Sequence, residues 1–488
     1  MHERRLPASF RDPSGFVFEE DGVIKRQVNS SYRPSYDLLV SSGLLAALTD
    51  AKLLVGHREA AAEEAEARRA YKILVPERIP FVSYPYEWSF GALKDAALAT
   101  LRVQSTALDH GMSLRDASAY NVQFVQGLPV LIDTLSFEAH AEGAPWIAYS
   151  QFCRHFLAPL ALMSMRDIRL GAMSRLFIDG IPLDLAAELL PGRTRLRPAL
   201  QIHLHAHAKS QRRHEARGVA RDDVKGRFSL TAFRGLVDSL EGAIRSLEWE
   251  PAGTWVDYYA EAEHYSEQAF LAKKRLVRSH LEATRPRVVW DLGANTGLFS
   301  RLAQEMGAFT VSFDIDPGAV EANYRRMRSE GDKSLLPLVL DLTNPSPGIG
   351  WANRERATVA DRGPADVCLA LALVHHLAIG GNVPLPQIAE ELARLGSMLV
   401  IEFVPKGDPK VDVLLSSRED IFADYTREGF ERAFGERFEI VAADDVPETK
   451  RTMYLMRAGS QGPTLEAFED RNEQRENERG NDEPDRAL

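Results

Sequence analysis

The sequence predicts a doubly wound α/β sheet in its C-terminal half, preceded by a region of different, α+β character. Three observations indicate this arrangement. From residue 288 onward, short apolar runs alternate with helical patterns. The alternation ends in two strands separated by a short connection, whereas residues 11–208 show no such pattern. The chain also has 488 residues, which exceeds one ordinary domain and predicts two or three.

Seven segments of the C-terminal half have the composition of strands. Most are apolar throughout, as expected for parallel strands that are buried on both faces. The last two are close in the sequence, which predicts an antiparallel strand near one edge of the sheet. A helix is expected around 421–434, before that pair. The predicted strands are 288–291, 309–314, 335–340, 365–371, 397–403, 438–442 and 452–457.

The first of these strands turns on glycines into a helix. Gly293 and Gly297 follow Asp291, and an apolar helical pattern begins at residue 298. A glycine backbone lets a ligand approach closely, and the helix N-terminus offers free N–H groups. Asn295 stands where a dinucleotide fingerprint has its second glycine, which argues against NAD. The pattern predicts a nucleotide-like ligand at this turn.

Acidic residues follow the next two strands. Asp314 ends the second strand, about 20 residues after the glycine turn, where a carboxylate can accept hydrogen bonds from ribose hydroxyls. Asp341, followed by Leu342, ends the third. Each acid taken singly could cap a helix or lie in a solvated loop. Together they indicate a ligand site at the carboxyl edge of the sheet.

The motifs over residues 252–457 resemble the class I S-adenosylmethionine (SAM) dependent methyltransferases, which have a Rossmann-like, seven-stranded fold. The resemblance implies SAM as the cofactor and methyl transfer as the activity. It implies that Asp314 takes the ribose and that Asp341 with Leu342 lies beside the adenine. Another doubly wound ligand binder, without catalysis, is the alternative. The SAM loop would be formed by Asp291, Gly293, Asn295 and Gly297.

Two adjacent histidines, His375 and His376, follow the fourth strand. Ligands of open α/β sheets bind outside the carboxyl ends of the strands, so a methyl acceptor would approach from that side. An imidazole can take a proton from an attacking hydroxyl or amine, although in-line positioning alone can supply much of the rate. We expect one of the pair to face the acceptor. Alternatively, one histidine caps a helix and the other packs against the sheet.

The N-terminal half begins with two predicted strands, 16–20 and 23–28, around the hairpin turn Asp21-Gly22. Helical and strand patterns alternate irregularly after it. The sequence predicts helices at 36–55, 60–70 and 89–110 and short strands at 71–75 and 79–83.

The run 114–134 resembles the catalytic loop and the metal-binding strand of protein-kinase-like phosphotransferases. Asp116, Asn121 and Asp133 match the order and spacing of that family's proton-accepting Asp, metal-binding Asn and second metal-binding Asp. A hairpin turn at 126–127 would bring the three together. The resemblance implies a kinase-like domain over residues 1–210.

The run also departs from the kinase pattern. Leu114 replaces the usual His, Thr134 replaces the aromatic residue before glycine, and the first hairpin has no Gly-rich loop. Lys25 is the best placed candidate for a phosphate-pairing lysine. An accessory domain of helices and a hairpin, with Asp133 in a turn, is the alternative.

The remaining segments and the net charge limit which functions are possible. Residues 211–251 are expected to form a helical linker, with an amphipathic helix within 228–249, and the helix within 254–281 either covers the SAM pocket or only packs. Residues 458–488 read as a disordered acidic tail. The net charge is −11 without a basic stripe, which argues against nucleic acid as the acceptor. No apolar run spans a membrane, which predicts a cytoplasmic protein.

The two cysteines, far apart in the sequence, argue against a disulfide framework or a thiolate metal cluster. His203, His205 and His207 alternate, so on a strand they would share one face and could bind zinc. On a helix they would be scattered. We expect no metal site.

The whole chain also resembles the NoeA-type nodulation-protein-like methyltransferases, which implies a saccharide or a small metabolite as substrate. We interpret the chain as a SAM-dependent methyltransferase that acts on such a molecule by in-line transfer. The alternatives are a bifunctional kinase–methyltransferase and a non-catalytic SAM-binding protein with a pseudokinase-like module. The segments that carry the resemblance are 84–90, 112–137, 152–159 and 202–205.

Overall fold

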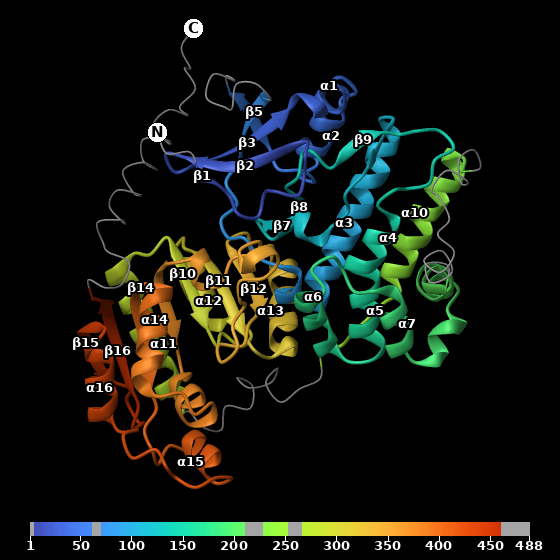
Figure 1. Cartoon of the computed structure of the whole chain (residues 1–488). Helices are drawn as coiled ribbons and strands as arrows, with labels where there is room; N and C mark the ends of the chain where they lie inside the picture. The colour runs from blue at the N-terminus through green and yellow to red at the C-terminus, as the bar shows by residue number, and fades with distance from the viewer. Residues whose placement is uncertain (1–3, 61–69, 210–227, 252–265, 460–488) are drawn as a thin grey trace. The chain divides into compact units, whose positions relative to one another are not determined.

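The computed structural model describes residues 4–60, 70–209, 228–251 and 266–459. Four predicted segments lie partly or almost entirely outside these residues. They are the 60–70 helix, the linker, the helix within 254–281 and the acidic tail. The chain divides into two compact units (Figure 1). The first comprises Met1–Ala252, Glu321–Lys333 and Pro347–Ala357. The second comprises Gly253–Val320, Ser334–Ser346 and Thr358–Leu488.

The second unit is built on a seven-stranded sheet with the order β12-β11-β10-β13-β14-β16-β15. Strands β10 to β14 are parallel, and β16 runs antiparallel between β14 and β15. All seven predicted strands are present, and the last pair is longer than predicted. Their bounds are β10 (Val288–Leu292), β11 (Phe309–Asp314), β12 (Leu335–Val339), β13 (Ala365–Ala370), β14 (Gly396–Phe403), β15 (Phe438–Asp445) and β16 (Thr452–Ala458).

The strand order reverses between β10 and β13. Successive strands run outward from β10 to β12 on one side and from β13 on the other. In open α/β sheets such a reversal leaves a crevice outside the carboxyl ends of the two central strands, where ligands bind. The glycine turn after β10 and the histidines after β13 both lie at this edge.

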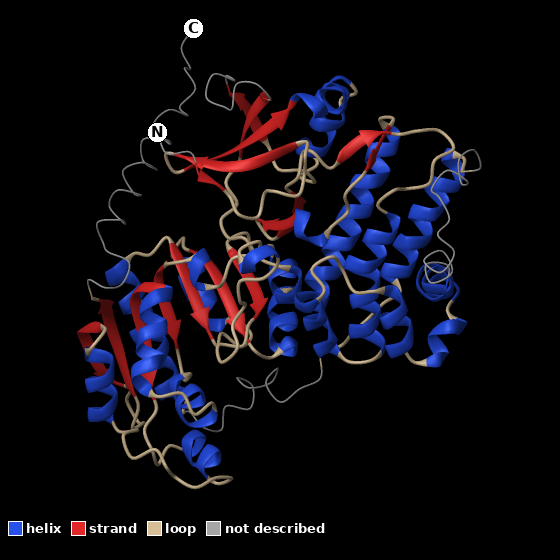
Figure 2. Ribbon diagram, viewed as in Figure 1, coloured by secondary structure: helices blue, strands red, loops and turns tan. Residues whose placement is uncertain are grey.

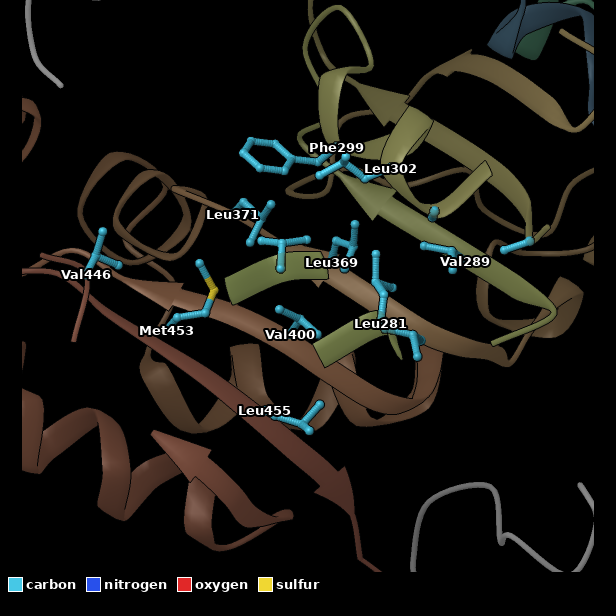
Figure 3. Close-up of a cluster of buried hydrophobic side chains, with 14 residues drawn as sticks. Leu281, Val289, Phe299, Leu302, Leu369, Leu371, Val400, Val446, Met453 and Leu455 are labelled. Carbon is cyan, nitrogen blue, oxygen red and sulfur yellow. The ribbon is translucent and has the colours of Figure 1, made fainter. Parts of the chain in front are cut away.

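Helices α11 (Glu267–Thr284) and α12 (Leu298–Glu305) share a buried apolar cluster with the sheet (Figure 3). Alternate strand residues point to one face, so Val289, Leu369 and Val400 join this cluster from three strands. Phe299 and Leu302 reach it from α12. The apolar periodicity of the two helices therefore fixes how they lie on the sheet.

Aromatic rings pack together around helix α16 (Arg427–Gly435). The Phe430 ring lies 4.9 Å from that of Phe403 and 5.1 Å from that of Tyr454, both on strands. The predicted helix 421–434 was too long at its start, because the Thr426 side chain accepts from the Gly429 N–H and caps the helix there. The other helices of this region are α14 (Leu385–Leu395) and α15 (Pro409–Leu415), and α13 (Pro317–Glu330) has residues in both units.

The first unit contains a five-stranded sheet with the order β1-β2-β3-β5-β4. The predicted hairpin is confirmed, with Asp21 (φ 49°) and Gly22 (φ 78°) in the left-handed conformations of a two-residue turn. The bounds are β1 (Arg4–Arg5), β2 (Gly15–Glu20), β3 (Val23–Asn29), β4 (His57–Ala60) and β5 (Ala70–Pro76).

Two predictions for this unit were wrong. The helix expected at 36–55 is two helices, α1 (Arg33–Ser41) and α2 (Leu44–Asp50), because Gly43 has φ 80° and ends the first. The segment 79–83 is not a strand. Instead of a ladder partner, the Ser83 N–H donates to Gln123 Oε1 (2.8 Å), and Gln123 Nε2 donates to the Ser83 carbonyl (2.9 Å).

The rest of the first unit is mainly helical (Figure 2). Its longest helix, α3 (Phe90–Asp109), was predicted, and the Ser89 side chain caps it by accepting from the Ala92 N–H. Among the described residues, no helix is both long and apolar enough to cross a membrane. The other elements are α4 (Tyr149–Phe152), α5 (Ala158–Met165), α6 (Met173–Leu176), α7 (Leu183–Leu189), α8 (Pro198–Leu200), α10 (Leu230–Arg245) and strands β6 (Met112–Leu114), β7 (Val122–Val125), β8 (Leu128–Leu131) and β9 (Phe137–Ala139).

Candidate functional site

The loop between β10 and α12 turns tightly at the carboxyl edge of the sheet. Gly293 (φ 76°), Asn295 (φ 51°) and Gly297 (φ 78°) all have left-handed backbone conformations. A Cβ at Gly293 would lie 3.3 Å from the side chain of Leu373, which follows β13. Glycine therefore leaves backbone exposed to a ligand where a side chain would be strained and crowded.

Asp314 is fixed against this loop. Its Oδ2 accepts from the Asn295 N–H (2.7 Å) and its Oδ1 from the Asp316 N–H (2.9 Å). Burial raises the pKa of the carboxyl. The Ile315 N–H also donates to this carboxylate, which keeps acceptor capacity that a ribose hydroxyl could use. The structure thus brings Asn295 and Asp314 together, as a ligand site requires.

Asp291 lies deeper than the loop. It is 2% exposed, and Ser300 of α12 donates to its Oδ2 at 2.6 Å. The Ser300 hydroxyl also lies 3.1 Å from that of Ser312 on β11. Burial raises the Asp291 pKa to about 6. This carboxyl therefore ties α12 to the strands, and its place in the SAM loop stays a prediction.

Two residues flank the loop on the side of β11 and β12. The Asp341 side chain accepts hydrogen bonds from the Thr343 N–H (2.8 Å) and from the Thr343 hydroxyl (2.6 Å). These bonds close a turn around Leu342. Ile315, directly after Asp314, is 62% exposed. Sequence reasoning missed Ile315, although an apolar residue just past a strand-ending acid was the available signal.

The two predicted histidines lie together after β13. Their ring centroids are 4.2 Å apart, and a π-helical turn, His376–Gly380, begins at the second. His375 is 1% exposed, and among the described residues its Nδ1 has no hydrogen-bond partner. Burial holds the pKa of His375 well below its usual value and also lowers that of His376, with Lys410 adding to the second effect.

Four buried charged side chains form one group, and three of them, Lys273, Glu402 and Arg451, act electrostatically on His375. Lys273 Nζ is 2.6 Å from Glu402 Oε2, and Arg451 Nη1 is 3.3 Å from Glu402 Oε1. Arg451 also binds Asp408 through Nε (2.7 Å) and Nη2 (3.0 Å). The sequence predictions gave Glu402 no role. A carboxylate within the apolar run of β14 was the signal for the whole group.

A pocket of about 370 Å³ lies beyond the π-helical turn. Ala378 of that turn lines it, as do Pro384, Phe422 and Tyr425. Arg432 and two acids add charge. Its walls are both polar and apolar, and it is open to solvent.

In the first unit, the structure links Asp116, Asn121 and Asp133. Asp116 accepts a side-chain hydrogen bond from Asn121, whose Nδ2 donates to the Ser136 hydroxyl (3.3 Å). Ser136 in turn donates to Asp133 Oδ2 (2.7 Å). Burial raises the Asp116 pKa, and the charge of Asp133 adds to that rise. The turn between β7 and β8, at Gln126-Gly127, makes this convergence possible.

The cation beside Asp133 is Arg26, which sequence reasoning missed. Its Nη2 lies 2.5 Å from Asp133 Oδ1. Lys25, the residue the sequence favoured, instead pairs with Glu20 at 2.7 Å. Adjacent residues of a strand point to opposite faces, so Lys25 and Arg26 cannot both reach Asp133.

The three alternating histidines are on a helical segment, not a strand. A π-helical turn, Gln201–Ala206, contains two of them. His203 lies 2.8 Å from both the Tyr149 and the Ser239 hydroxyls, whereas His205 lies 2.9 Å from the Thr194 hydroxyl. Among the residues that the structure describes, no group of three or more His, Cys, Asp or Glu side chains is placed to hold a metal ion.

Comparison with known proteins places the chain in a family. Nodulation protein NoeA of Rhizobium meliloti (strain 1021) is 36% identical over 460 residues, which is 92% of this chain and 95% of that protein. The chain belongs to the NoeA family. No protein-family model matches the sequence.

Solved structures similar to this NoeA-family chain each cover about two fifths of it. The WbdD structure has a TM-score of 0.30 at 16% identity, over 41% of this chain and 42% of WbdD. Magnesium protoporphyrin IX methyltransferase (ChlM) of Synechocystis PCC 6803, with bound SAH, has a TM-score of 0.28 at 17% identity, over 40% of this chain and 86% of ChlM. With scores this low, the fold assignment rests on the strand order.

Proposed function

We propose that this NoeA-family protein transfers the methyl group of SAM to a small molecule or a saccharide. The observation that carries the proposal is the glycine loop after β10, held to Asp314 where the strand order reverses. When bound, SAM supplies an activated methyl group. The loop backbone at Gly293 and Gly297 would hold its amino-acid part, and Asp314 would accept from its ribose hydroxyls.

The remaining residues of this site have narrower roles. The exposed Ile315 would pack against the adenine ring, with Asp341 and Leu342 beside it. His375 or His376 would face the acceptor. The pocket beyond the π-helical turn would offer room for part of a small acceptor.

Calorimetric titration with SAM tests the cofactor. Asp314→Ala removes an acceptor of two ribose hydrogen bonds, each worth on the order of 1.5–3 kcal/mol at most to a charged group. We expect SAM affinity to fall at least tenfold. Glu305→Ala is the matched control, because Glu305 is an exposed acid on α12. Unchanged affinity in Asp314→Ala, or no SAM binding by the wild type, would overturn the assignment.

A second activity is favoured by one observation, the convergence of Asp116, Asn121 and Asp133. We infer that the first unit is kinase-like and that Arg26, not a metal ion, neutralises Asp133. The ion pair takes a carboxylate oxygen that Mg²⁺ would need. This supports a pseudokinase-like module over an active phosphotransferase.

Titration of the full chain with ATP, with and without Mg²⁺, tests this inference. We expect any ATP binding by the wild type to be independent of Mg²⁺, and Arg26→Ala to make it Mg²⁺-dependent. Steady ATP turnover by the wild type would instead establish the bifunctional alternative.

A further inference from the structure

Four charged side chains are buried together beside strand β14. Lys273, Glu402, Arg451 and Asp408 have side chains at most 8% exposed. The desolvation of such groups costs as much as their attraction returns, so an apolar group of the same size would serve stability equally well. Charge kept in such a position is typical of a functional site.

The charges are gathered at the carboxyl edge of the sheet. Glu402 is the residue before the last of β14, and Arg451 directly precedes β16. Lys273 reaches them from α11. His375 follows the neighbouring strand β13, which pairs with β14 up to Ala370 and Ile401. Glu402 lies on β14 and His375 on the segment that follows the adjacent strand β13, at the edge where open α/β sheets bind ligands.

His375 has unused hydrogen-bonding capacity at this point. Its Nδ1 has no partner among the described residues, and the side chain is buried. The charged and titratable groups that act on it are His376, Arg451, Glu402 and Lys273. Only Glu402 among them favours the protonated ring, whereas the other three oppose it. Asp408 and Lys410 act on the same groups from the segment after β14.

We propose that His375 takes the proton of the methyl acceptor at Nδ1 and that Glu402, held by Lys273 and Arg451, is the positioning residue that stabilises the resulting imidazolium. The acceptor is then a neutral hydroxyl or amine, not a carboxylate or another anion that needs no base. This inference rests on the proposed methyltransferase function and names its substrate class.

The step balances for a hydroxyl acceptor. The acceptor oxygen forms the new O–C bond, the S–C bond of the methyl donor breaks, and its electron pair stays on sulfur. The hydroxyl proton passes to His375 and then to solvent.

A double-variant cycle, followed by NMR, tests whether Glu402 acts on the protonation of His375. The full chain carries ¹³C,¹⁵N-labelled histidine, and His375→Gln identifies the His375 signals. Lys273→Met leaves Glu402 paired with Arg451 but removes a cation that opposes protonation, so the His375 pKa should rise. Adding Glu402→Gln to Lys273→Met should reverse that rise. Glu431→Gln, which alters a carboxylate bonded to Tyr454 elsewhere in the unit, should leave the His375 signals unchanged.

Two outcomes would overturn the inference. His375 could titrate identically in Lys273→Met and in the double variant, which would show that Glu402 does not act on it. Alternatively, with deuterated-methyl SAM and a mixture of glucose, glycerol, ethanolamine and acetate, the wild type could label acetate alone. We expect label on a hydroxyl or amine, reduced at least tenfold in Glu402→Gln. SAM titration of the same proteins separates these results from failure of the proposed function. If the wild type binds no SAM, the proposed function itself fails, whereas SAM binding with unchanged labelling in Glu402→Gln would contradict only the role of Glu402.

Discussion

Gly293 shows how a single residue keeps the cofactor loop open. Its φ of 76° strains any residue with a Cβ, and the added Cβ would crowd Leu373. The sequence predicted a glycine turn here from spacing alone. It could not predict the crowding, because Leu373 lies on a loop 80 residues later in the chain.

Gly293→Ala should therefore lower both stability, by roughly 1–2 kcal/mol, and SAM affinity. Gly235→Ala is the matched control. Gly235 is in α10, where an added Cβ meets nothing within 4 Å, so alanine should stabilise the helix by about 0.5–1 kcal/mol. Urea unfolding and SAM titration measure the two effects. Equal behaviour of the two variants would contradict the strain at Gly293.

His155 makes stability depend on pH. Burial lowers its pKa to about 3, against about 6.5 in an unfolded chain. The unfolded state then binds more protons between these values, so stability is complete above about pH 6.5 and falls as the pH drops toward 3. This residue alone should cost roughly 3 kcal/mol between pH 7 and pH 4.

His155→Gln removes the titrating group, so its unfolding free energy should fall less steeply below pH 6.5 than that of the wild type. Urea unfolding at pH 8, 7, 6, 5 and 4 measures the two slopes. At pH 8 the slopes should coincide, because the imidazole is neutral in both states there. Parallel curves from pH 7 to pH 4 would show that His155 is not the source.

Among the elements, the parallel strands were predictable and the irregular segments were not. A strand buried on both faces is an apolar run, and the sequence shows that run directly. In the sequence, Gly43 looks like a glycine that a helix tolerates, although it ends α1. The segment 79–83 is not a strand because its Ser83 N–H bonds to the Gln123 side chain, which is distant in the sequence. Arg26 was missed for the same reason, since only the paired sheet shows which strand face it occupies.

The connection between α12 and the strands gives a prediction of its own. Ser300→Ala removes the hydroxyl that donates to Asp291 and leaves a buried carboxylate with fewer partners. We expect a loss of about 1–3 kcal/mol in unfolding free energy. Ser329→Ala, which removes an exposed local hydrogen bond on α13, should change stability little. Equal losses in both variants would mean that the Asp291 contact does not stabilise α12.

At the scale of the whole molecule, more of the C-terminal half than of the N-terminal half could be predicted from the sequence. The C-terminal motifs follow one another at successive strand ends, so the strands and the candidate cofactor residues could be predicted together. In the N-terminal half, Asp116, Asn121 and Asp133 were predicted to meet, but the cation beside them was not. The buried group around Glu402 also escaped prediction, because its members are 129 residues apart along the chain from Lys273 to Glu402.

We propose that this NoeA-family protein moves the methyl group of SAM to a small molecule or a saccharide. The most direct measurement incubates the full chain with deuterated-methyl SAM and a small-molecule extract of the organism that makes it, followed by untargeted mass spectrometry. We predict a product in which CD₃ replaces hydrogen, formed by the wild type and lost in Asp314→Ala. Binding of SAM without any labelled product in such extracts would contradict the claim and leave a non-catalytic SAM-binding protein.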